Sequence, residues 1–106
     1  MPKSLPFTVF HQSGGAVEYK FPLHPETQSA IDVHNVLEHL RDALTFLLDN
    51  KKMGNGDVLQ AITMLLCMRA NMVDVDRDTM RSLLEEMLAN NMAATHAAIH
   101  NQASRA

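Results

Sequence analysis

The segment that most restricts what this chain can fold into is "DVLQAITMLLCMRANM", residues 57–72. Its composition and spacing predict a helix. Gln60, Thr63 and Asn71 fall on one narrow line of that helix, and apolar residues cover most of the remaining circumference. A helix that is apolar on so many sides is normally the central, buried helix of its fold. Any fold that contains it must therefore supply neighbours around it.

The chain is too short to supply many of those neighbours. Its 106 residues predict a single domain, residues 1–106, and 46% apolar with 20% charged residues is ordinary globular composition. Besides helix 57–72 we predict one β-hairpin and two further helices, which do not suffice to surround it. We therefore expect a homodimer or another protein partner.

The hairpin is predicted from strict alternation over residues 7–21. The alternation gives one apolar face, which consists of Phe7, Val9, Val17, Tyr19 and Phe21. A three-residue loop, residues 13–15, would place Gly15 at a positive φ and pair Val9 with Tyr19. A two-stranded hairpin is marginal alone, so it must lie on helices or on another chain.

The two other helices are predicted over about residues 25–50 and 76–100, before a frayed tail at residues 101–106. In the first, Pro25 suits the opening turn. In the turn at residues 51–56, Gly54 suits a left-handed helix end, and Asp57 with Gln60 resembles a capping box. Acidic residues at 74–78 suit the start of the last helix. The predicted fold class is α+β, mainly α: an N-terminal hairpin followed by three helices.

Candidate interaction surfaces come from apolar residues that lie off the predicted core. Phe10 falls on the solvent face of the hairpin, next to unpaired strand edges. In helix 25–50, Ile31 and Phe46 lie opposite the core stripe, with His39 between them. These four residues form the predicted interaction surface.

A metal site is the alternative that the histidines raise. His96 and His100 are four residues apart in the predicted last helix, and His34 with Glu38 forms a second such pair. Four convergent ligands are what a structural zinc site needs. If the two helices are antiparallel neighbours, these four side chains would meet; otherwise they are solvated helix faces, where histidines can still sense pH.

Other functional classes lack support in the sequence. We find no nucleophile, phosphate-binding or paired-carboxylate motif, so we expect neither an enzyme nor a cofactor. A net charge of −3 with scattered basic residues disfavours nucleic acid. No apolar run suits a membrane helix, and one cysteine, Cys67, expected to be buried, suits the cytoplasm.

The sequence therefore predicts a small, homo-oligomeric protein-interaction module of the adaptor, regulator or chaperone-like class. The alternative is a helical protein that binds a metal or a small ligand through the histidines of its first and last helices.

Overall fold

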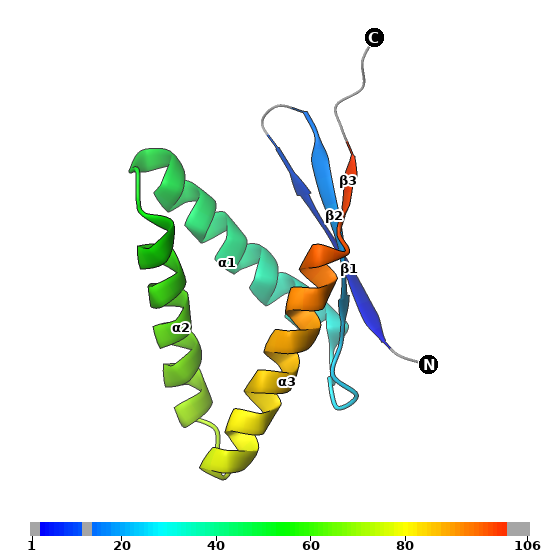
Figure 1. Cartoon of the computed structure of the whole chain (residues 1–106), viewed down its shortest axis with the longest axis vertical. Helices are drawn as coiled ribbons and strands as arrows, with labels where there is room; N and C mark the ends of the chain where they lie inside the picture. Colours follow the sequence, from blue (N-terminus) through cyan, green and yellow to red (C-terminus); the bar gives the residue numbers. More distant parts are fainter. Residues whose placement is uncertain (1–2, 12–13, 102–106) are drawn as a thin grey trace. The chain divides into compact units, whose positions relative to one another are not determined.

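The structure, a computed structural model, describes residues 3–11 and 14–101. Along the chain the elements are β1 (Ser4–Phe10), β2 (Ala16–Pro22), α1 (Ala30–Asn50), α2 (Asn55–Asn71), α3 (Arg77–His96) and β3 (Ile99–Asn101) (Figure 1). The predicted fold class, a hairpin followed by three helices, is confirmed. Apart from Asn101, the predicted tail 101–106 lies outside the described residues.

The chain divides into two units. The sheet unit comprises residues 1–35 and 84–106, and it contains all three described strands. The helical unit comprises residues 36–83, with most of α1, all of α2 and the start of α3. Both α1 and α3 are continuous helices that begin in one unit and end in the other.

The sheet is antiparallel, in the order β1-β2-β3. The predicted apolar face of the hairpin is correct, and Leu5 extends it. The predicted register is wrong by two residues, because Val9 lies opposite Val17, and Phe7 lies opposite Tyr19. A shift by two residues keeps every side chain on its face, so alternation alone does not detect it.

The loop between the strands lies one residue earlier than predicted. The amide N–H of His11 donates to the Gly15 carbonyl (2.8 Å), and the Gly14 N–H donates to the His11 carbonyl (3.0 Å). Residues 12–14 thus connect the strands, with residues 12 and 13 outside the described part of the chain. Gly14, and not Gly15, has the positive φ of 95° that such a connection requires.

Two prolines explain why this register is favoured. Hydrogen-bonded and non-hydrogen-bonded pairs alternate along an antiparallel ladder. His11 bonds to Gly15, and Leu23 donates to the Lys3 carbonyl (2.9 Å), so the odd-numbered residues of β1 lie in hydrogen-bonded pairs. Pro6 and Pro22 both fall in the other class, where no N–H donor is needed. In the predicted register they would have faced each other.

The start of α1 follows a local cap. α1 begins at Ala30, and not near residue 25, because Ser29 caps it: the Ser29 hydroxyl oxygen accepts the Asp32 N–H (3.1 Å). Pro25 lies instead in a turn closed by the Thr27 N–H and the His24 carbonyl (2.9 Å).

α2 begins at Asn55, two residues earlier than predicted, with Gly54 as its N-cap. Gly54 has φ −73°, which is ordinary extended backbone and not a left-handed helix end. No side chain caps this helix, so the predicted Asp57–Gln60 capping box is wrong. The helix opens two residues before Asp57, which places Asp57 within the first turn instead of at the cap.

α3 ends at His96, four residues earlier than predicted. The Ala98 N–H donates to the Thr95 carbonyl (3.3 Å), which tightens the last turn. Ile99–Asn101 then pairs with Ala16–Glu18 as β3. The edge of β2 offers backbone partners to this segment, and a β-branched residue such as Ile99 suits a strand. This is a long-range pairing that helical periodicity does not reveal.

Candidate interaction surfaces

The inner face of the sheet carries the buried core of the described residues, which consists of Leu5, Phe7 and Val17. The ring of His34, in the first turns of α1, packs edge-on against Phe7, with 5.4 Å between ring centroids. Tyr19 and Phe21 stack along the same face at 5.4 Å. This face is thus occupied by the chain's own side chains, and it holds the sheet unit together.

The outer face of the sheet leaves large apolar side chains in solvent. Phe10 is 77% exposed and Ile99 is 62% exposed. Both project from this face, because Phe10 lies opposite Ala16, and Ile99 lies opposite Glu18, two residues along β2. We call Phe10, Ala16 and Ile99 the outer-face patch. The structure places Phe10 where the sequence predicted it, and β3 adds Ile99, which the sequence had assigned to a helix.

The predicted surface of α1 is exposed but not contiguous. Ile31 and Phe46 are 73% and 67% exposed, and His39 between them is exposed as well. Ile31 and Phe46 are fifteen residues apart on one helix, about 22 Å along its axis. They are too far apart to form a single pocket.

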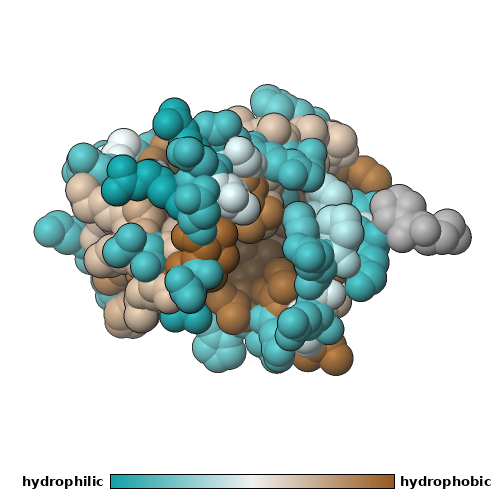
Figure 2. Space-filling view, turned by 90° about the horizontal axis from the view of Figure 1, so that it is seen from below, coloured by the Kyte–Doolittle hydropathy of each residue, from teal (hydrophilic) through white to brown (hydrophobic). Residues whose placement is uncertain are grey.

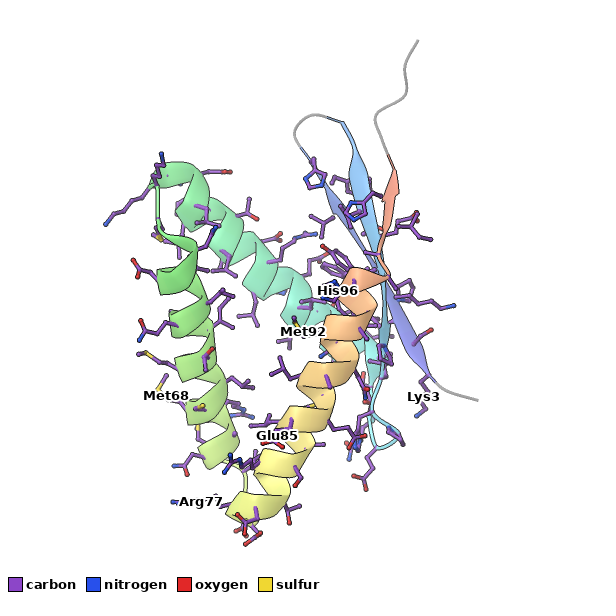
Figure 3. All side chains as sticks on the ribbon, viewed as in Figure 1. Lys3, Met68, Arg77, Glu85, Met92 and His96 are labelled. Carbon is purple, nitrogen blue, oxygen red and sulfur yellow. The ribbon has the colours of Figure 1, made fainter. Side chains whose placement is uncertain are left out.

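α2 exposes large apolar side chains along its length. None of its seventeen residues is buried, and only Val58 and Ala70 are half-buried. Figure 3 shows its side chains, Met68 among them, projecting from the ribbon, and Figure 2 shows apolar side chains reaching the molecular surface between polar ones. We use the term α2 surface for the large exposed apolar residues of this helix, which are Leu59, Ile62, Met64, Leu65, Leu66 and Met68.

The histidines do not form the predicted pair. His96 is the last residue of α3, whereas His100 lies in β3 opposite Val17, so the two no longer share a helical face. His34 contacts Phe7 instead of a second ligand. Across residues 3–11 and 14–101, no three His, Cys, Asp or Glu side chains gather as a metal site would require, and His34, Glu38, His96 and His100 are not brought together.

The sequence misjudged α2 in one respect. It predicted a central helix with a buried Cys67, whereas Cys67 is exposed like the rest of the helix. The signal was present, because the apolar circumference of residues 57–72 exceeds what the other elements of a short chain can cover. This exposure makes α2 a candidate interaction surface. The sequence had predicted interaction surfaces only on the hairpin and on α1.

Comparisons of the chain with protein-family models, with curated proteins and with solved structures give no match. Among the helices of the described residues, none is both long and apolar enough to span a bilayer.

Proposed function

We propose that this chain is a small protein-interaction module that works as a homo-oligomer, in the class of adaptors, regulators and chaperone-like factors, without catalytic activity of its own. The observation that carries the proposal is the exposure of α2, on which no residue is buried although most are apolar. Exposed apolar area of this extent marks a surface that binds protein.

The arrangement separates a self-contained part from an incomplete part. The sheet unit has its own buried side chains, Leu5, Phe7 and Val17, whereas the described helices have none. A helix without buried residues gains little from tertiary packing, which is the main source of helix stability in proteins. The helices therefore require cover from another molecule, and the outer-face patch remains as a second surface for a different partner.

Native mass spectrometry on untagged protein, purified without added metal, tests the proposal. We expect a clean multiple of the 11.8 kDa chain mass. A monomer, with or without the extra mass of a metal ion, would contradict it. An assembly that carries stoichiometric metal would also contradict the expectation that the module works without a cofactor.

A further inference from the structure

We propose that one turn of α2 binds a Cu(I) ion through three sulfur atoms, which belong to the thiolate of Cys67 and the thioethers of Met64 and Met68. The inference goes beyond the proposed function, because it assigns a metal site to a helix whose surface is otherwise apolar. The metal site that the sequence raised as an alternative used histidines, and this turn contains none.

Helical spacing places the three side chains on one face of α2. Residues three and four positions apart in a helix are neighbours, with Cβ atoms about 5–6 Å apart. Cys67 follows Met64 by three residues and Met68 follows it by four, so all three fall within about 100° of the circumference. A methionine side chain has three rotatable bonds, so both thioethers can turn toward the Cys67 sulfur. Met72 lies about 7.5 Å beyond Cys67 along the axis, outside this turn.

The three side chains are accessible to an ion from solution. Met64 and Met68 are 55% and 61% exposed, and Cys67 is a free, exposed cysteine. Figure 3 shows the labelled Met68 projecting from α2. All three residues belong to the helical unit. The site is therefore complete within one turn of one helix.

The donor set selects Cu(I) among the common metal ions. Thiolate and thioether sulfurs are soft ligands, which favour Cu(I). Calcium and magnesium require oxygen ligands, and a structural zinc ion requires four ligands from thiolates, imidazoles and carboxylates. Residues 64–68 contain no histidine, aspartate or glutamate. Zinc would thus find a single ligand in this turn, whereas Cu(I) finds three.

Binding exchanges the thiol proton of Cys67 for the ion. The S–H bond breaks, the proton goes to solvent, and the sulfur bonds to copper, which stays Cu(I) throughout. The thiolate and the ion together carry no net charge. Arg69, the basic residue of the last turn, lies about 160° around the helix from Cys67 and does not repel the ion at close range. Because the sulfurs are exposed, the ion exchanges with solvent, and a chain purified without added metal is expected to be metal-free.

Substitution of single methionines tests the site on the full chain. Leucine removes the sulfur but keeps the size and apolar character of the side chain, so Met64→Leu and Met68→Leu preserve the fold. Met92→Leu is the matched control, because Met92 lies on α3 and is 52% exposed. Anaerobic titration with the Cu(I)–acetonitrile complex, in competition with a coloured Cu(I) chelator, gives stoichiometry and affinity. We expect one ion per wild-type chain, an affinity about tenfold lower in each α2 variant, and no change in Met92→Leu.

Alkylation of Cys67 gives a second readout of the same site. Because it is the only cysteine, its reaction with iodoacetamide shows whether its sulfur holds the ion. We expect Cu(I) to protect Cys67 in the wild type and in Met92→Leu, and to protect it less in Met64→Leu and Met68→Leu. If both α2 methionine variants bind Cu(I) as the wild type does while Cys67→Ser does not, a thiol alone holds the ion and the inference is overturned. Equal weakening by Met92→Leu also overturns it.

Discussion

Single side chains fix where two of the three helices begin. The Ser29 hydroxyl oxygen accepts the Asp32 N–H at the start of α1, and the Asp76 carboxylate accepts the Thr79 N–H (3.1 Å) before α3. α2 begins without any side-chain cap. α1 and α3 therefore have their N-terminal ends fixed by local side-chain hydrogen bonds, and α2 does not.

Removing the Asp76 carboxylate tests this assignment. We expect Asp76→Ala to lower the free energy of unfolding by about 1 kcal/mol, because one exposed helix N–H loses its acceptor. Asp76→Asn keeps an acceptor oxygen and should lose much less. Asp74→Ala removes the same charge outside the cap and serves as the control. Urea denaturation measures all three variants, and an equal loss in Asp74→Ala would show that charge, and not capping, is responsible.

The exposure of individual residues was predictable only where it depends on local pattern. Alternation along β1 was enough to put Phe10 on the outer face. The state of Cys67 was not predictable in this way, because its helix is apolar on most sides and its cover depends on what packs against it. The same limit applies to Ile99, whose place on the outer face follows from a strand that pairs far along the sequence.

At the scale of elements, the hairpin shows what alternation decides and what it leaves open. It decides the face of each residue, but registers that differ by two residues share the same faces. The prolines decide between them, since Pro6 and Pro22 both need places without a ladder hydrogen bond. This constraint is present in the sequence, and it would have corrected the predicted loop.

Paired cysteines distinguish the two registers directly. In a Cys67→Ser background, Thr8→Cys with Glu18→Cys should form a disulfide readily, because these residues face each other in a non-hydrogen-bonded pair with Cα atoms about 4.5 Å apart. Thr8→Cys with Lys20→Cys is the pair that the predicted register would bring together, and we expect little oxidation. Thiol titration after mild oxidation gives the yields, and a higher yield for the second pair would refute the register.

The helix ends show a second limit of local reasoning. Helical periodicity extended the last predicted helix to residue 100, because Ala97 and Ala98 are compatible with a helix. The chain leaves the helix there since the edge of β2 accepts Ile99–Asn101 as a third strand. That gain comes from residues about eighty positions earlier, and it also separates His96 from His100, on which the predicted metal site depended.

For the whole molecule, the decisive quantity is apolar area that the chain does not cover by itself. The buried side chains of the described residues all belong to the sheet, and the helices leave their largest apolar residues in solvent. A small domain with so little buried surface is marginally stable as a monomer. In the proposed homo-oligomer, association supplies the missing stability, so that folding and association form one equilibrium.

That coupling predicts a dependence of thermal stability on protein concentration. For a dimer that unfolds to two separate chains, each tenfold rise in concentration adds about 1.4 kcal/mol to the stability of the dimer. Over a hundredfold range the melting temperature should therefore rise by roughly 5–10 °C. Gln60→Glu should show the same slope as the wild type, since it leaves the α2 surface unchanged. Circular dichroism at 222 nm follows the helices directly. A melting temperature that stays constant over this range would mean that the helices are stable within a single chain, and the proposed homo-oligomer would then not be what folds α2.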